Sequence, residues 1–223
     1  MEADQHREWI ERVVRDQGGV IRSRFNPNSQ QRMRANAAAW RRWNPDDDDV
    51  QWVLERYTDG IHRNDLGLLA CELDTRVDRR RAFVATLVWG AGSTNRYYGR
   101  HSEALSYPHL DEMLRRSVDA VRQGELGQSW NAMSRLPGLQ FRFFTKWLWV
   151  AGANAEIVPR PLVFDQRVID GLKATAWPYH PRRINYRQRW LNYCADADAV
   201  AKQLGVTGEW IEYWLFCGGP HAV

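Results

Sequence analysis

Apolar residues recur at intervals of three and four along most of the chain, and no convincing series of alternating apolar and polar residues appears. The first spacing places apolar side chains on one face of a helix, whereas alternation is typical of a half-buried strand. The pattern therefore predicts an all-α fold of many short helices. These span residues 1–17, 30–43, 50–61, 66–73, 80–90, 109–124, 126–136, 166–173, 186–205 and 207–219, with a further aromatic helix after residue 138.

Glycines and aspartates predict several helix ends. Gly18 and Gly19 are expected to end the first helix, and Gly205 the helix at 186–205. The sequence NPDDDD at 44–49 predicts a proline turn, and its aspartates favour the dipole of the helix that follows. We interpret this acidic run as a solvated helix cap rather than as a metal site.

Length and composition indicate a single domain covering residues 1–223. Hydrophobic residues make up 44% of the chain, enough for a substantial core. No apolar run reaches the roughly 18 residues of a membrane span, and the charged start is unlike a signal peptide. The three cysteines are widely spaced, and neither CxxC nor HExxH occurs. We therefore expect a soluble cytoplasmic protein without a metal or a cofactor.

The basic residues are almost all arginines. The net charge is +4, and among 31 Lys plus Arg only Lys146, Lys173 and Lys202 are lysines. Arginine binds phosphate with a planar fork and stacks on bases, so an arginine-rich, tryptophan-rich chain suits a nucleic-acid partner. A GC-rich genome, whose codons favour arginine, explains the composition equally well. On either interpretation, a lysine at position 146 departs from the usual cation of this chain.

Leu136-Pro137-Gly138 predicts a sharp turn before the aromatic helix. Proline fixes φ at the first corner, and glycine accepts a positive φ at the second. The helix that follows would present free backbone N–H groups to a phosphate, with Arg135 and Arg142 adding positive charge. An ordinary corner between two helices fits the same residues.

Two segments carry a family resemblance: LPGLQFRFFTKWLW at 136–149 and PLVFDQRV at 161–168. They resemble the helix-hairpin-helix and catalytic-aspartate region of DNA glycosylases, in the bacterial branch with the 8-oxoguanine DNA glycosylase fold. WIEYWLF at 210–216 is similar to the last helix of that branch. The resemblance implies a two-lobed helix-hairpin-helix fold with a DNA-binding cleft, whose hairpin and catalytic segment occupy about 126–175.

The resemblance also implies that the hairpin contacts DNA through Gly138, Leu139 and Gln140, with Arg142 beside them. The family hairpin usually has a second glycine where this chain has Gln140. Such a glycine allows the backbone to lie close to DNA. Gln140 therefore alters the hairpin or supplies a hydrogen bond to phosphate.

Asp165 follows the apolar residues 162–164 and precedes a helix, so it is a candidate N-cap. The resemblance gives it a catalytic role. A sugar that loses its base becomes oxocarbenium-like, and a nearby carboxylate stabilises that positive charge. The two roles are compatible, because backbone N–H donors stabilise the charged carboxylate. Asp165 can also orient a water molecule or activate an amine.

The family's nucleophilic lysine has two possible positions in this chain. Counting forward from Gly138 places it at Arg142, whereas counting back from Asp165 places it at Lys146. The two residues are four apart and share one helix face. Because arginine stays protonated and cannot form a Schiff base, Lys146 is the candidate nucleophile. The alternative is a phosphate-contacting or surface lysine, with water attacking and Asp165 as the essential group.

The loop GAGSTNRYYGRH at 90–101 is polar, basic and rich in glycine. By resemblance, the segment after the central helix inserts into DNA where the base has left. Asn95 then contacts a base edge or fills the gap, Arg96 and Arg100 bind phosphates, and Tyr97 or Tyr98 stacks. An ordinary glycine-rich connection is the alternative.

A base that leaves the duplex needs an aromatic or apolar pocket. Aromatic residues at helical spacing belong more often to the core, so the pocket is the least specific part of the prediction. The candidates are Trp89, Tyr97, Trp214 and Phe216.

Together these patterns predict a monomeric DNA glycosylase that flips a modified base out of double-stranded DNA and cleaves its N-glycosidic bond. The resemblance leaves two substrate classes open. One is a phage-type base such as glucosylated hydroxymethylcytosine, removed in anti-phage defence, and the other is oxidised guanine, removed in base-excision repair. Strand cleavage through Lys146 also stays open. The rival interpretations are a non-catalytic helix-hairpin-helix DNA-binding protein and a protein-interaction domain without DNA affinity.

Overall fold

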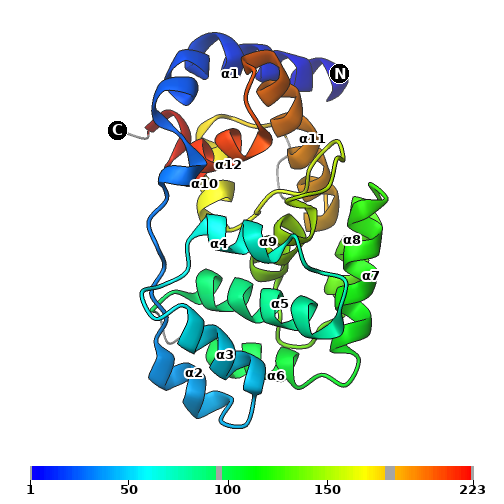
Figure 1. The fold of residues 1–223 in the computed structure, drawn as a ribbon. Coiled ribbons are helices and arrows are strands. Elements are labelled where there is room, and N and C mark those ends of the chain that lie inside the picture. Colours follow the sequence, from blue (N-terminus) through cyan, green and yellow to red (C-terminus); the bar gives the residue numbers. More distant parts are fainter. Residues whose placement is uncertain (1, 94–96, 179–183, 222–223) are drawn as a thin grey trace. The chain divides into compact units, whose positions relative to one another are not determined.

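The computed structural model describes residues 2–93, 97–178 and 184–221. These residues form twelve α-helices and two short 3₁₀-helices, and their one β element is an isolated bridge between Met33 and Ile61 (Figure 1). The predicted all-α fold is therefore confirmed. None of the described helices combines the length and the hydrophobicity needed to cross a lipid bilayer.

The chain divides into two compact units. Unit 1 joins both ends of the chain, Met1–Ser29 and Val158–Val223, whereas unit 2 is the continuous segment Gln30–Ile157. Asp165 belongs to unit 1, and the hairpin and Lys146 belong to unit 2.

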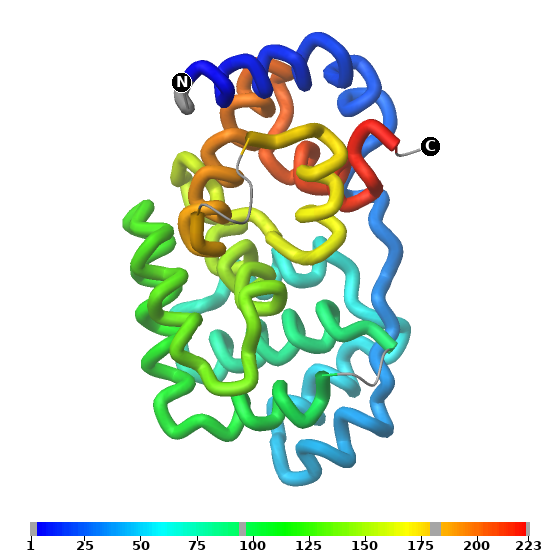
Figure 2. The backbone as a smooth tube through the Cα atoms, turned by 180° about the vertical axis from the view of Figure 1, so that it is seen from behind, coloured from blue at the N-terminus to red at the C-terminus, as the bar shows by residue number. Residues whose placement is uncertain are grey.

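Unit 1 is built around two helix pairs, α1 with α11 and α10 with α12. Figure 2 shows the blue N-terminal helix lying beside the orange α11. Helix α10 approaches α12 closely: a Cβ on Gly171 would lie 2.2 Å from the carbonyl oxygen of Leu215, so a larger residue does not fit. The elements are α1 (Glu2–Arg24), η1 (Pro27–Ser29), α10 (Gln166–Ala174), α11 (Tyr186–Leu204), α12 (Gly208–Phe216) and η2 (Gly219–His221).

The predicted end of the first helix at Gly18 and Gly19 is wrong, because α1 continues through both glycines to Arg24. Each glycine inside a helix costs up to about 1 kcal/mol relative to alanine. Tertiary packing offsets this cost. A Cβ on Gly18 would lie 2.6 Å from Leu204 of α11, so the missing side chain lets the two helices approach.

Unit 2 centres on α5 and α9, whose side chains are buried over residues 82–89 and 143–151. Trp147 of α9 meets Phe83 of α5 edge to face at 5.5 Å, and its indole N–H donates to Oγ of Ser117 at 2.8 Å. Helices α7 and α8 pack side by side next to this core (Figure 1). The elements are α2 (Ala37–Trp43), α3 (Asp48–Arg56), α4 (Arg63–Leu69), α5 (Arg76–Ala91), α6 (Tyr98–Leu105), α7 (Leu110–Arg122), α8 (Leu126–Met133) and α9 (Phe141–Gly152).

The predicted helix at 30–43 is too long, because only Ala37–Trp43 is helical. Met33 instead exchanges two backbone hydrogen bonds with Ile61, at 2.8 and 3.0 Å. The side chain of Asn36 then accepts from the N–H of Ala39 and begins α2. The bridge to residue 61 fixes an extended backbone that helix propensity alone did not indicate.

Candidate functional site

The hairpin between α8 and α9 requires glycine at its second corner. Gly138 has φ +69°, and a Cβ there would lie 2.5 Å from the carbonyl oxygen of Arg100 on α6. Both features exclude a larger residue without strain. Leu139 is buried and anchors the turn. The hairpin is therefore a fixed corner held against α6, and its exposed parts are backbone and Gln140.

Gln140 is the N-cap residue of α9 and is exposed. Its backbone is extended, with φ −87° and ψ 158°, a conformation open to any residue. The backbone therefore does not demand the second glycine of the family hairpin. The side chain of Gln140 makes no capping hydrogen bond, so the first turn of α9 has no side-chain cap. Such a helix start is suited to an anion.

Lys146 lies in the second turn of α9 with only 8% of its surface exposed. Its aliphatic chain crosses Gly90 of α5, where a Cβ would stand 2.9 Å from Cδ of Lys146. The ammonium group lies 5.8 Å from the ring centre of Trp89 and 5.9 Å from that of Phe143. Its Nζ donates to the carbonyl oxygen of Arg142 at 3.3 Å. The lysine predicted from sequence is thus a packed side chain beside aromatic rings.

Arg142, the other position for the family's lysine, is in the first turn of α9 and half-buried. Its guanidinium carbon lies 5.7 Å from the ring centre of the neighbouring Phe141. Arg142 is therefore placed at the helix start with the hairpin, whereas Lys146 lies one turn further along.

Asp165 is the N-cap of α10, as the sequence predicts. Its Oδ1 accepts from the backbone N–H groups of Arg167 and Val168, at 3.0 and 3.2 Å. The side chain is half-buried, neither fully exposed nor sealed in the core of unit 1. The cap fixes the position of one carboxylate oxygen.

The segment before Asp165 is tied to two further helices. The N–H of Val163 donates to the buried Glu212 of α12 at 2.8 Å, and the indole of Trp190 on α11 donates to the carbonyl oxygen of Leu162 at 2.8 Å. The ring of Phe164 stacks on Tyr193 at 5.6 Å. A side chain within a backbone held this way keeps its position, as a catalytic group must.

The predicted loop contacts are only partly described by the structure. Asn95 and Arg96 lie outside the described residues. Arg100 is exposed on α6, and its backbone touches the hairpin at Gly138. Tyr97 is half-buried and meets Phe143 edge to face at 4.9 Å. The structure therefore brings Arg100 and Tyr97 next to the hairpin and the start of α9.

The four base-pocket candidates have different surroundings. Trp89 is buried and tilted against Trp149, with ring centres 6.4 Å apart. Trp214 is fully buried in unit 1. Phe216 is half-buried, and the guanidinium carbon of Arg167 lies 4.0 Å from its ring centre, two residues from Asp165 in the chain. Trp89 therefore neighbours Lys146, and Phe216 contacts the helix that Asp165 caps.

Sequence reasoning missed His101, which is 1% exposed on α6. Its ring stacks on Trp40 at 5.7 Å and meets Phe143 edge to face at 4.5 Å. Neither ring nitrogen has a hydrogen-bond partner among the described residues. Burial lowers the pKa of His101 to about 4, so the ring is neutral near pH 7. The glycine-rich sequence that precedes His101 did not indicate that this histidine is buried.

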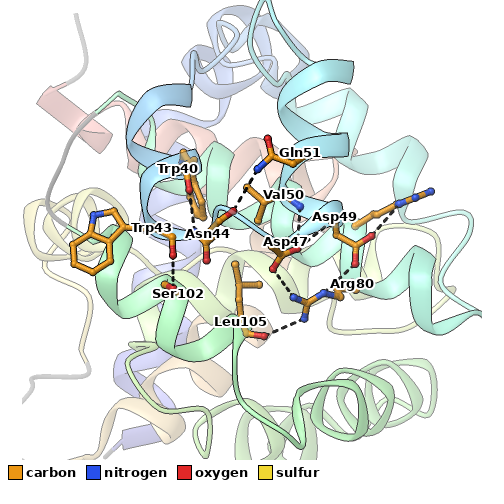
Figure 3. A network of polar contacts seen from close by, with 11 residues as sticks. Trp40, Trp43, Asn44, Asp47, Asp49, Val50, Gln51, Arg80, Ser102 and Leu105 are labelled. Atoms are coloured by element: carbon orange, nitrogen blue, oxygen red, sulfur yellow. Dashed lines mark hydrogen bonds and ion pairs between the residues drawn. The ribbon is translucent and has the colours of Figure 1, made fainter.

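A cleft of about 620 Å³ lies in unit 2, and none of the predicted site residues lines it. Five aspartates line it, and Figure 3 shows two of them, Asp47 and Asp49, facing Arg80, which binds them at 2.6 and 3.0 Å. Asp47 also caps α3, which confirms the cap predicted for the acidic run. Within the described ranges, no three His, Cys, Asp or Glu side chains are grouped to hold a metal ion.

The sequence profile of a family described as "Putative 8-oxoguanine DNA glycosylase OGG-like protein" matches residues 26–216. This range includes the hairpin, Lys146 and Asp165 and covers most of both units. Neither a curated protein nor a solved structure matches the chain.

Proposed function

Because the chain belongs to the OGG-like family of putative 8-oxoguanine DNA glycosylases, we propose that it extrudes a modified base from double-stranded DNA and cleaves its N-glycosidic bond. The bond between the base and C1′ breaks, and the base leaves with the bonding electrons. The observation that carries the proposal is Asp165, a carboxylate fixed by two backbone N–H donors within the matched segment.

Asp165 acts on the sugar. As the base departs, positive charge develops at C1′ and the ring oxygen, and a fixed carboxylate stabilises that charge without reorganising. The bonds from Arg167 and Val168 both reach Oδ1 of Asp165. The same carboxylate accepts a proton from the attacking water or amine.

Lys146 supplies the amine of a covalent route. It is the single lysine of unit 2, since the other two lysines of the chain are Lys173 and Lys202. In its neutral form the amine displaces the base at C1′ and loses a proton. Opening of the C1′–O4′ bond then gives the Schiff base, from which the 3′ phosphate is eliminated and the strand is cleaved. Arg142 cannot act as a nucleophile, and its guanidinium group binds a DNA phosphate instead.

A panel of duplexes tests the reaction and the base together. Each duplex carries one 8-oxoguanine, uracil, hydroxymethylcytosine or glucosylated hydroxymethylcytosine, and abasic sites and strand breaks are scored after incubation. We expect base release from 8-oxoguanine or from the glucosylated base, and a loss of at least about 10³-fold in Asp165→Asn. Asparagine is itself a good N-cap, so this variant keeps the helix start.

Asp47→Asn is the matched control. Asp47 caps α3 with two backbone N–H bonds, as Asp165 caps α10. We expect Asp47→Asn to retain the rate of base release. Equal activity of Asp165→Asn and the wild-type protein would show that residue 165 is only a cap, and the catalytic proposal would then be abandoned.

Borohydride separates the two routes. Reduction traps a Schiff base as a stable protein–DNA adduct. We expect an adduct with the wild-type protein and with Arg142→Gln, but not with Lys146→Gln. Abasic sites that form without any trapped adduct would contradict the covalent role of Lys146 and leave water as the nucleophile.

A further inference from the structure

Trp43, the last residue of α2, is 52% exposed. All twelve tryptophans of the chain lie within the described residues, and the other eleven are buried or half-buried. A single exposed apolar side chain is common on protein surfaces. Trp43 differs from such residues because its position is fixed by contacts with another helix.

Helix α6 fixes Trp43 in two ways. Oγ of Ser102 donates to the carbonyl oxygen of Trp43 at 2.9 Å. A Cβ on Gly99 would lie 3.3 Å from Cη2 and Cζ3 of the indole, so the glycine lets the ring rest against the helix. Because the indole is positioned in advance, binding a ligand would cost little conformational entropy.

The hairpin packs against the same end of α6. Gly99 contacts Trp43, and the carbonyl oxygen of the next residue, Arg100, contacts Gly138. The end of α2 and the hairpin therefore both pack against the start of α6. We refer to Arg42, Trp43, Arg100, Arg135 and Gln140 together as the hairpin region.

The arginines of the hairpin region are available to a ligand. Arg42, Arg100 and Arg135 are exposed, and their side chains make no hydrogen bond or ion pair with any described residue. Arg42 adjoins the exposed Trp43 in the chain, and Arg100 adjoins Gly99, which contacts the indole. Unpaired guanidinium groups close in the chain to an exposed indole and its contact match a ligand with both phosphates and flat rings. Nucleic acid has both, since phosphates take arginine and bases stack on aromatic side chains.

We propose that Trp43 stacks on an unpaired nucleobase of the DNA substrate while Arg42 and Arg100 bind neighbouring phosphates. The proposal rests on the glycosylase function, because extruding a base exposes the faces of the bases around the gap. It assigns the end of α2 a role in substrate binding, apart from the hairpin and the two predicted catalytic residues.

The acidic cleft restricts where the phosphates can lie. Trp43 is one of its lining residues. Figure 3 shows the indole extending away from Asp47 and Asp49, on the other side of Asn44. Asp47 and Asp49 are neutralised by Arg80, and Asp49 also by Arg81 at 3.1 Å. The exposed Asp46 and Asp48 also line the cleft and keep its side of Trp43 negative. The phosphates are therefore expected near Arg42 and Arg100, at the α6 end of the region.

Anisotropy titrations with two labelled duplexes test the proposal. One duplex is intact, and the other carries a tetrahydrofuran abasic analogue, which leaves base faces uncovered and resists cleavage. We expect Trp43→Ala to weaken binding of the abasic duplex by roughly 10-fold and of the intact duplex by much less, as for the loss of one stacked base. Leu68→Ala, at an apolar residue of unit 2 that is 70% exposed, should change neither affinity.

A second pair of variants covers the case in which Trp43→Ala does not fold. Trp43→Phe keeps a flat ring, whereas Trp43→Leu keeps the apolar contact with Gly99 without one. We expect Phe to retain the preference for the abasic duplex and Leu to lose it. Equal behaviour of the two variants overturns the stacking role. Failure of the glycosylase function is distinguishable, because the wild-type protein would then release no base from any duplex of the panel, whereas failure of the stacking role leaves base release by the wild-type protein intact.

Discussion

Unit 2 holds its arginines in two opposite ways. Six arginines of α5 and α7 are paired with carboxylates, whereas Arg42, Arg100 and Arg135 of the hairpin region have no partner among the described residues. The pairs are Arg79–Asp111, Arg80–Asp47, Arg80–Asp49, Arg81–Asp49, Arg115–Asp119, Arg116–Glu112 and Arg122–Asp74.

The difference shows why the net charge of +4 says little about where DNA binds. A guanidinium already bound to a carboxylate has its donors occupied and its charge neutralised, so a phosphate would have to displace the carboxylate. An unpaired guanidinium releases counterions from DNA without that cost. The position of the carboxylates therefore selects which arginines remain for a polyanion. Three of them lie in the hairpin region, and Arg34 and Arg76, elsewhere in unit 2, are exposed and form no ion pair with a described residue.

Removing the three unpaired arginines gives the largest expected effect. Each phosphate that no longer binds an arginine reduces the magnitude of the slope of log affinity against log salt by about 0.9. At about 0.15 M salt this change corresponds to a loss of affinity by a factor of roughly 5 per phosphate. We expect the triple variant Arg42→Gln, Arg100→Gln, Arg135→Gln to bind duplex DNA about 100-fold more weakly. Anisotropy titrations between about 0.05 and 0.3 M salt, which bracket the concentration where the Debye length is about 8 Å, measure both quantities.

The matched control carries the same three changes on α7, at Arg115, Arg116 and Arg122. Each of these arginines is paired with a carboxylate. The control variant should keep the wild-type salt slope. A slope that falls equally in both triple variants would break the comparison, because paired and unpaired arginines would then serve DNA alike.

Gly138→Ala tests whether the hairpin is held closely against α6. Alanine at φ +69° is strained, and its Cβ meets the carbonyl oxygen of Arg100 at 2.5 Å. Gly124→Ala has a similar φ of +75° with nothing within 4 Å, so it isolates the backbone strain. We expect Gly138→Ala to lower the free energy of unfolding by about 2 kcal/mol more than Gly124→Ala, because backbone must move. Urea unfolding of both variants gives the difference, and equal losses would mean that the hairpin is not held against α6.

Local signals predicted the helix ends that local chemistry sets. Asp47 and Asp165 cap α3 and α10, and Gly205 ends α11 in the left-handed conformation. Where distant residues intervene, the predictions fail. Gly18 stays helical because Leu204 packs against it, and residues before Asn36 are extended because Met33 pairs with Ile61.

The candidate site shows the same limit. Local spacing predicted the turn at Gly138 and the cap at Asp165, because each is set by residues next to it in the chain. The catalytic roles of Lys146 and Asp165 stay predictions. The exposure of Trp43 depends on Gly99 and Ser102, more than fifty residues further along the chain, and the burial of His101 depends on Trp40 and Phe143. The pairing of Arg80 with Asp47 likewise joins two helices. No local pattern distinguishes a paired arginine from an unpaired one.

His101 makes the hairpin side of unit 2 sensitive to acid. The rings around it, Trp40, Tyr97 and Phe143, supply no counter-ion. Because burial lowers its pKa from 6.5 to about 4, the folded state binds fewer protons than the unfolded state between these values. The stability from this group is complete above pH 6.5 and is lost as the pH falls towards 4. At pH 5 the loss amounts to about 2 kcal/mol.

His101→Phe keeps an aromatic ring and removes the titration. Urea unfolding at about pH 7 and pH 5 should show a smaller acid loss in His101→Phe than in the wild-type protein, by about the amount that this group contributes. His109→Phe, at an exposed histidine of unit 2, serves as the control and should leave the acid loss unchanged. An identical acid loss in all three proteins would show that the buried ring is not the acid-sensitive group.

The smallest expected effect comes from the uncapped start of α9. Gln140 makes no capping hydrogen bond, and a serine or aspartate there supplies one, which raises the free energy of unfolding by roughly 0.5–1 kcal/mol. The two substitutions differ in charge. If the hairpin region binds a phosphate at this helix start, Gln140→Asp should stabilise the fold yet weaken DNA binding several-fold, whereas Gln140→Ser should stabilise it with little loss of affinity. Equal affinities of the two variants would show that no phosphate binds at this helix start. The difference in DNA binding between the hairpin region and α7 would then rest on the unpaired arginines alone.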